Sequence, residues 1–409
     1  MEVVMETKYE FYDLERSLKD YEFTAKAFQR MNSVVYSADF EDMDSDTIFI
    51  YLYKQFDHIS FKDHLKRYIY KHAEIKEEFR DVPEDVYKEI LLYSFEENGA
   101  PFSFEPTTKR KNAIIKSWLS QDYVRRSTVF LLGFGLKMSQ EDVSEFLTKV
   151  ILEEDFNMLD PEEAVYRFCF KNGLRYAEAL SLLKQYEGFD ENEEIMPQDM
   201  NEINEMIKKY QFEIMSIAEM RTYLKMLKKL YIYNDRQNTS YLEFMSLIGR
   251  VKRIIADIYN EDNEGINERQ KTKDSISYGD IERMICSGIP LTKSGNLQKM
   301  SVSALAKRFR YRRMSRQRLD DVTTRKIRVD RFDIITLLFF IYSQEQQELE
   351  PEIRLKNYMN ETNAILDKCS MMRLYPVNPY EAFVMMCLLS ECPLETYSDT
   401  LELSYKAGE

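Results

Sequence analysis

Residues that interrupt regular structure are scarce in this chain, which contains only 11 glycines and 10 prolines among 409 residues. β-Sandwiches and β-barrels need a turn after about every 8–12 residues, and such turns draw on glycine and proline. Long stretches in which apolar residues recur at intervals of three and four are instead typical of amphipathic helices. The sequence therefore predicts an all-α fold, and its length predicts more than one helical unit.

Composition divides the chain into three regions. We expect an N-terminal helical unit at 1–187, a central spacer of long helices at 188–260 and a C-terminal helical unit at 276–409. The polar stretch between the last two is nearly devoid of apolar residues, as exposed connections are. This organisation predicts two helical units joined by a helical spacer.

Several N-terminal segments carry the spacing of one-sided helices. Ser60 or Asp57 is suited to cap one of them, and Pro83 followed by acidic residues indicates the start of another. The segments expected to be helical are Tyr21–Met31, Asp46–Phe56 and Phe61–His72.

Two segments of the chain resemble each other. Residues 160–169 and 378–387 both follow the pattern Asp/Asn-Pro-x-Glu-Ala-x4-Cys, at an offset of 218. Farther upstream, Arg126–Leu132 parallels Arg331–Leu337 at an offset of 205. Ordered matches separated by short gaps favour an internal duplication, while chance similarity between two helices rich in Leu and Glu is the alternative.

Cysteine usage and hydropathy indicate a cytoplasmic protein. Apolar runs fall short of the roughly 18 residues that a membrane span needs, so we expect no membrane association. The cysteines are odd in number, and none forms a Cys-x-x-Cys pair, which argues against a disulfide framework. They are Cys169, Cys286, Cys369, Cys387 and Cys392.

The sequence lacks the patterns that are typical of catalysis or metal binding. The histidines His58, His64 and His72 lack the close spacing of metal ligands. Gly133 and Gly135 lack the third glycine of a dinucleotide-binding loop, and no glutamate closes the acidic loop that begins at Asn260. We therefore expect no enzymatic activity, no catalytic residues, no metal and no cofactor.

One strongly basic segment interrupts this acidic chain. Between Lys307 and Arg331 there are eleven Lys or Arg and three Asp, a local net charge of +8, whereas the whole chain carries −14. We call this segment the basic island. Clustered positive charge of this kind is the electrostatic requirement for binding a polyanion.

The residues around the basic island follow a recognisable order. Leu305-Ala306 falls in a helix expected to begin near Ser301, Ser315 can cap a short helix at Arg316–Val322, and an aliphatic helix is expected from about Asp330. This order, over residues 301–342, resembles the lambda-repressor-like (Xre/Cro) helix-turn-helix family. A weaker, degenerate version is present at 109–129. The resemblance implies a recognition helix that enters the major groove of double-stranded DNA.

The resemblance also assigns roles to the basic side chains. Arg316, Gln317 and Arg318 would face base edges, since Arg matches guanine and Gln matches adenine, while the other residues would hold the phosphate backbone. The expected nucleic-acid-binding residues are Lys307, Arg308, Arg310, Arg312, Arg313, Ser315, Arg316, Gln317, Arg318, Arg325, Lys326 and Arg328.

These observations predict a DNA-binding transcriptional regulator, or a regulator associated with a mobile element. Two other interpretations of the island stay open: a solvated helix face neutralised by the chain's own acids, or a docking surface for an acidic protein. The alternative function is a non-catalytic helical adaptor for protein–protein interaction, with a protein partner or a second copy of the chain as the ligand.

Overall fold

The fold is helical throughout the part of the chain that the structure describes, which confirms the predicted all-α class. Within that part no β-strand forms, and an isolated β-bridge joins Leu291 to Leu297. None of the described helices is long and apolar enough to cross a membrane. The computed structural model describes residues 44–55, 60–73, 75–104, 110–189, 216–237, 239–262, 270–376 and 378–408, together with 203, 205–207, 209 and 214.

The chain divides into two compact units. Unit 1 comprises Met1–Gln29 and Asp57–Tyr233, and unit 2 comprises Arg30–Phe56 and Asn234–Glu409. The region expected to be a separate spacer is thus shared between the units, since most of the helix that ends at Gln237 belongs to unit 1 and the helix that begins at Thr239 belongs to unit 2. An N-terminal segment also joins unit 2, a long-range association that helix periodicity does not encode.

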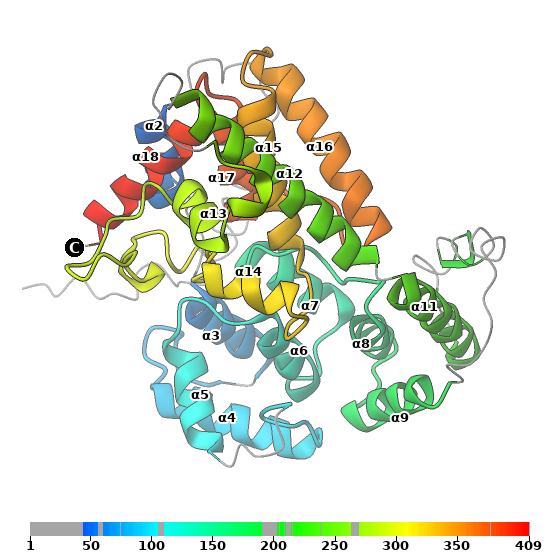
Figure 1. Cartoon of the computed structure of the whole chain (residues 1–409). Helices are drawn as coiled ribbons and strands as arrows, with labels where there is room; N and C mark the ends of the chain where they lie inside the picture. The colour runs from blue at the N-terminus through cyan, green and yellow to red at the C-terminus, as the bar shows by residue number, and fades with distance from the viewer. Residues whose placement is uncertain are drawn as a thin grey trace, which may run out of the picture. The chain divides into compact units, whose positions relative to one another are not determined.

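Unit 1 is built from short helices (Figure 1). They enclose a core that is rich in aromatic side chains. Trp118 is buried and packs against Phe95, with 5.4 Å between the ring centroids. Gly135 allows the Phe95 ring to pack against the backbone, because a Cβ there would lie 2.0 Å from the ring. Its helices are α3 (Phe61–His72), α4 (Glu84–Glu97), α5 (Lys111–Ser120), α6 (Arg126–Gly135), α7 (Gln140–Glu145), π-helix η4 (Phe146–Val150), α8 (Pro161–Lys171), α9 (Tyr176–Glu187) and most of α11 (Ile217–Gln237).

Unit 2 contains several long helices, together with one helix from the N-terminal part of the chain. In Figure 1, α2 (blue) lies beside α18 (red), although they come from opposite ends of the chain. Its elements are α2 (Ser45–Ile50), π-helix η3 (Tyr51–Gln55), α12 (Thr239–Asp262), 3₁₀-helix η5 (Lys273–Ser275), α13 (Tyr278–Ile285), 3₁₀-helix η6 (Met300–Val302), α14 (Arg316–Thr323), α15 (Arg331–Glu345), α16 (Pro351–Lys368), α17 (Pro379–Leu388) and α18 (Pro393–Lys406).

The core of unit 2 is formed by α15 and α17. All of Phe332–Ser343 in α15 and all of α17 are buried. A helix that is apolar around its whole circumference must be covered on every side, and α12, α16 and α18 each pack against α15. The near-continuous apolar sequence of these two helices thus sets the centre of the unit.

Several helix boundaries agree with the sequence. The helix predicted at Phe61–His72 is α3, and Ser60 rather than Asp57 caps it by accepting the Asp63 N–H. The segment Asp46–Phe56 is occupied by α2 and η3, and α4 follows Pro83. The predicted helix Tyr21–Met31 lies outside the described residues.

Gly288, just after α13, marks a close backbone approach that gives a first testable prediction. A Cβ on this residue would lie 1.7 Å from the carbonyl oxygen of Ser398 in α18. We expect Gly288→Ala to lower the free energy of unfolding by about 1–3 kcal/mol through overpacking, measured by urea denaturation.

Gly249, inside α12, provides the matched control. Nothing lies within 4 Å of a Cβ built there. Gly249→Ala should therefore raise the stability by roughly 0.5–1 kcal/mol, because alanine is the better helix former. If both substitutions changed the free energy of unfolding in the same direction, the contact with Ser398 would not be what determines the effect of Gly288→Ala.

Candidate nucleic-acid interface

The basic island surrounds α14, which forms where the sequence predicts a short helix. Ser315 is its N-cap, and its hydroxyl accepts the backbone N–H of Arg318 at 3.1 Å. The aliphatic helix expected from Asp330 is α15, for which Asp330 is the N-cap. Side-chain capping thus fixes the start of both helices, as expected from the sequence.

The helix predicted from Ser301 to Met314 does not form, and this part of the prediction is wrong. Only the 3₁₀ turn η6 and a run of turn residues at 304–311, which ends in a tight turn, occupy the segment. The turn closes with the N–H groups of Arg310 and Tyr311 donating to the carbonyls of Lys307 and Ala306. Crowding of like charges at helical spacing weakens a helix here. Leu305-Ala306 therefore does not lie in the α-helix that the helix-turn-helix pattern requires.

Arg318 is used inside the protein instead of facing outward. Its Nε and Nη2 atoms lie 2.5 Å and 2.9 Å from the carboxylate oxygens of Asp333, which is fully buried in α15. Burial raises the pKa of Asp333, and Arg318 opposes that rise. Asp330 adds a second, longer contact at 3.8 Å. The pair anchors α14 to α15, so Arg318 is not placed to read a base.

Other island residues also have partners within unit 2. In half of these contacts a guanidinium or ammonium group is paired with a carboxylate, which reduces the positive charge available to an outside ligand. The contacts are Arg312–Asp330 at 3.4 Å, Arg313–Glu282 at 3.2 Å, Lys326–Asp321 at 3.3 Å, Gln317–Asp321 at 2.9 Å, Arg308 to the Tyr53 carbonyl at 3.1 Å, and Arg325 over the Tyr241 ring at 4.3 Å.

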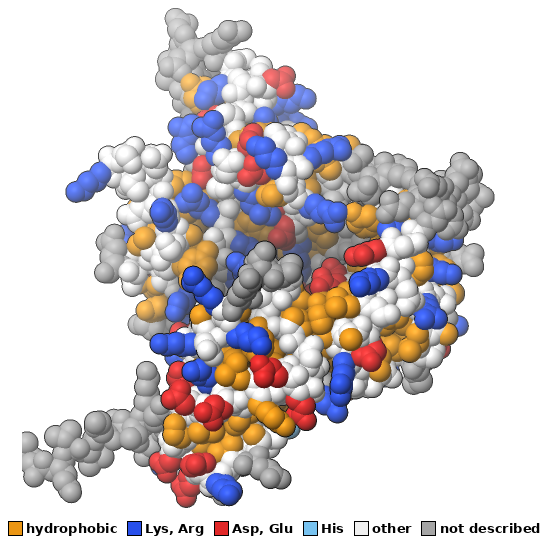
Figure 2. Space-filling view, turned by 90° about the horizontal axis from the view of Figure 1, so that it is seen from below, with side chains coloured by type: hydrophobic (Ala, Val, Ile, Leu, Met, Phe, Trp, Pro, Cys, Tyr) orange, Lys and Arg blue, Asp and Glu red, His pale blue; other side chains and the backbone are white. Residues whose placement is uncertain are grey.

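Positive charge nevertheless stays at the surface of the island. On the face of the molecule drawn in Figure 2, basic side chains are interspersed with acidic and hydrophobic ones. The expected binding residues divide into two groups by exposure. The half-buried residues are Arg308, Arg310, Arg313, Ser315 and Arg318. The exposed residues are Lys307, Arg312, Arg316, Gln317, Arg325, Lys326 and Arg328.

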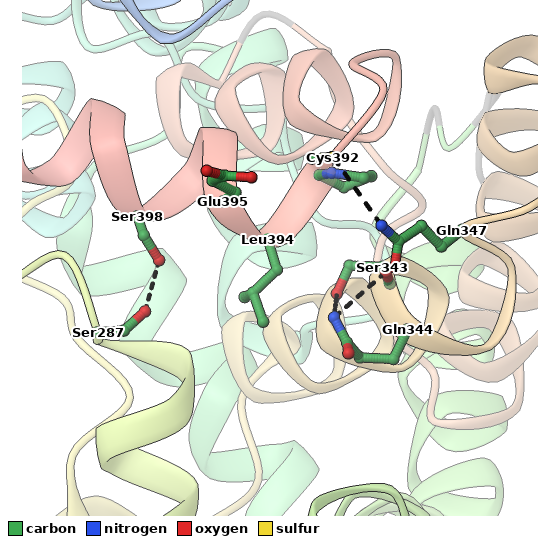
Figure 3. A pocket seen from close by; sticks show the side chains of 9 residues that line it. Ser287, Ser343, Gln344, Gln347, Cys392, Leu394, Glu395 and Ser398 are labelled. Atoms are coloured by element: carbon green, nitrogen blue, oxygen red, sulfur yellow. Dashed lines mark hydrogen bonds between the residues drawn. The ribbon is translucent and has the colours of Figure 1, made fainter. Parts of the chain in front are cut away.

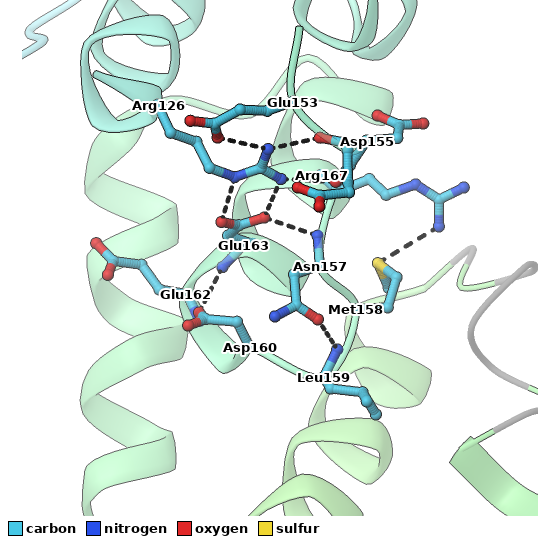
Figure 4. Close-up of polar contacts among 11 residues, drawn as sticks. Arg126, Glu153, Asp155, Asn157, Met158, Leu159, Asp160, Glu162, Glu163 and Arg167 are labelled. Carbon is cyan, nitrogen blue, oxygen red and sulfur yellow. Dashed lines mark hydrogen bonds and ion pairs between the residues drawn. The ribbon is translucent and has the colours of Figure 1, made fainter. Parts of the chain in front are cut away.

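A polar contact set in unit 1 was not anticipated from the sequence. Arg126, the first residue of α6, binds the carboxylate of Glu163 in α8 through two hydrogen bonds of 2.6 Å, as Figure 4 shows. It also donates to the backbone carbonyls of Glu154 and Asp155. Glu163 in turn accepts the Asn157 N–H at 2.7 Å. We call the Arg–Glu pair and these loop contacts the Arg–Glu clamp.

The same clamp is present in unit 2. Arg331, the first residue of α15, binds Glu381 of α17 at 3.1 Å and the Arg373 carbonyl at 2.6 Å. Glu381 accepts the Tyr375 N–H at 2.7 Å. The arginines match at the offset of 205, and the glutamate and loop residues match at 218. The two similar segments therefore make equivalent contacts.

The beginnings of α8 and α17 also agree. Asp160 and Asn378 each accept the two free N–H groups of the helix that follows, with proline at the first helical position. Both clamp residues are identical in the two segments, so the sequence held a signal for the clamp. The sequence match did not show, however, that the arginine of one helix binds the glutamate of another.

A cavity of about 390 Å³ opens in unit 2 at the N-terminus of α18 (Figure 3). Polar side chains of α15, of α18 and of the turns that follow α13 and α15 border it, including Ser343, Gln347 and Glu395. Cys392 also borders it and is the one exposed cysteine within the described residues. Among those residues no group of His, Cys, Asp or Glu is placed to hold a metal ion. The cavity thus offers hydrogen-bonding groups and one thiol.

Comparisons with known proteins add no family to these observations. No family model, curated protein sequence or solved structure matches the chain.

Proposed function

We propose that the chain is a non-catalytic DNA-binding regulator, whose basic island in unit 2 holds the phosphate backbone. The observation that supports this proposal is the exposure of Lys307, Arg316, Arg325 and Arg328 around one short, capped helix. Exposed cations gathered in one segment attract a polyanion even when the whole protein is acidic.

The internal pairs change the expected mode of binding. Arg318 is committed to Asp333, and Gln317 to Asp321. Of the three residues expected at base edges, Arg316 and Gln317 are exposed at the start of α14, and Gln317 is hydrogen-bonded to Asp321. Backbone contacts give affinity without sequence information, so we propose binding that depends more on charge than on base sequence.

A second candidate function is a helical adaptor for an acidic protein. It is favoured by the contacts of Arg312, Arg313 and Arg318, because each binds a carboxylate of this chain. The island is thus chemically suited to protein carboxylates as well as to phosphates.

Arg316→Glu tests the proposal cleanly. Glutamate in the first turn interacts favourably with a helix N-terminus, so we expect α14 to keep its stability. Affinity for a labelled DNA duplex, measured by fluorescence anisotropy at several salt concentrations, should fall roughly tenfold at low salt. The slope of log K against log salt should become shallower by about 1.

Lys356→Glu is the matched control, because Lys356 is an exposed residue of α16 in the same unit. It removes the same charge outside the island and should leave the affinity nearly unchanged. Absence of binding by the native chain at roughly 10–100 µM in low salt would contradict the DNA proposal. A stoichiometric acidic protein, retained after nuclease treatment and lost on Arg316→Glu, would then support the adaptor.

A further inference from the structure

The tight turn of the basic island presents one aromatic ring to solvent and buries another. Phe309 is 2% exposed and stacks on Phe383, with 5.2 Å between the ring centroids. Tyr311, two residues later, is 56% exposed. The buried ring anchors the turn to α17, so the exposed ring is held on a fixed support.

The backbone of this turn adopts a conformation that its residues disfavour. Arg310 and Tyr311 have φ values of 52° and 57°, in the left-handed region. Their N–H groups donate to the carbonyls of Lys307 and Ala306 in the pattern that ends many helices, where glycine is the usual residue. Side chains at two successive left-handed positions carry a conformational cost that glycine would avoid. Such strain is frequent where a side chain is required for function.

Exposed cations flank the Tyr311 ring in the sequence. Lys307 and Arg316 are both exposed and lie within five residues of it. An aromatic ring combined with cations suits a nucleic-acid strand whose bases are accessible, because the ring stacks on a base and the cations hold phosphates. In an intact duplex the base faces are already stacked on one another. Binding through phosphate contacts alone would not need an exposed aromatic ring.

We propose that Tyr311 stacks on an unpaired base, so that the basic island takes single-stranded DNA in preference to an intact duplex. This inference rests on the proposed function and specifies the form of the nucleic acid. It assigns Tyr311 a direct contact with the ligand, whereas Phe309 supports the turn from below.

The first test compares single-stranded and duplex DNA of one sequence by anisotropy. The native chain should bind the single strand more tightly, and Tyr311→Ala should weaken that binding by roughly 5- to 150-fold, the range found for losing one base-stacking ring. Tyr311→Phe should retain the affinity, since the ring is kept. Tyr311→Gly should weaken binding while raising the thermal midpoint, because glycine relieves the left-handed strain.

The second test reports on stacking itself. The fluorescence of a Tyr311→Trp variant should be quenched by single-stranded DNA but not by heparin, a polyanion without bases. Tyr93→Trp is the control, since Tyr93 is 69% exposed in α4 of unit 1 and should not respond.

The outcomes separate the two proposals. If Arg316→Glu weakens DNA binding while Tyr311→Ala does not, the stacking inference is wrong and the proposed function stands. If the native chain binds neither form of DNA, both are wrong. Quenching of Tyr311→Trp by heparin to the same extent as by DNA would overturn base stacking alone.

Discussion

Replacing Glu381 with glutamine is expected to lower the free energy of unfolding by about 3–5 kcal/mol, the usual cost of removing one partner from a buried ion pair. Side chains of Glu381 and Arg331 are only 5% and 17% exposed. Burial raises the pKa of Glu381, and the positive charge of Arg331 opposes that rise. Glutamine has nearly the shape of glutamate and keeps an oxygen that can accept the Tyr375 N–H. The loss of stability therefore reports the removal of the negative charge alone. Urea denaturation measures it.

Glu163→Gln in unit 1 is the matched comparison. The Glu163 side chain is 14% exposed, against 5% for Glu381, and Glu153 lies 3.3 Å from Arg126 as a second carboxylate. We therefore expect a smaller loss than for Glu381→Gln. Replacing Arg331 and Glu381 together by Met and Leu should restore much of the stability, because both charges of the buried pair are then removed. An equal or larger loss for Glu163→Gln would contradict the electrostatic explanation of the clamp.

Local sequence signals located several helices correctly. The boundaries of α3 follow from apolar spacing and Ser60, and the start of α17 follows from Asn378-Pro379. These signals act between residues that are close in the chain, through capping and helix periodicity. They do not report packing between distant segments, which is why the association of α2 with unit 2 could not be predicted.

The candidate site was predictable in composition but not in arrangement. The basic segment and the helix capped by Ser315 were evident from the sequence. The neutralisation of Arg318 was not, because it depends on how α14 packs against Asp333 of α15. The left-handed turn at Arg310 and Tyr311 was also missed, since Ala, Leu, Lys and Arg favour helices locally and tertiary packing overrides that preference.

Acidification is expected to destabilise unit 1 through His64 of α3. Its ring is buried against Phe146, with 4.6 Å between centroids. Burial, together with the positive charges of Arg67, Lys71 and Lys149, lowers the pKa of His64 to about 3. In the unfolded chain the same imidazole titrates near its ordinary pKa of about 6.5. Below that pH the unfolded state binds a proton that the folded state does not.

The contribution of His64 to stability is therefore complete above about pH 6.5 and is lost as the pH falls toward 3. At pH 4.5 the loss should reach about 3 kcal/mol, since one pKa unit corresponds to about 1.4 kcal/mol. His64→Leu removes the titrating group, so its stability should fall less steeply between pH 6 and 4, by about 1.4 kcal/mol per pH unit. The carboxylates titrate in both proteins and cancel in this comparison. Parallel stability curves for the two proteins would show that the His64 imidazole accepts a proton in the folded state without cost, and that burial does not control its charge.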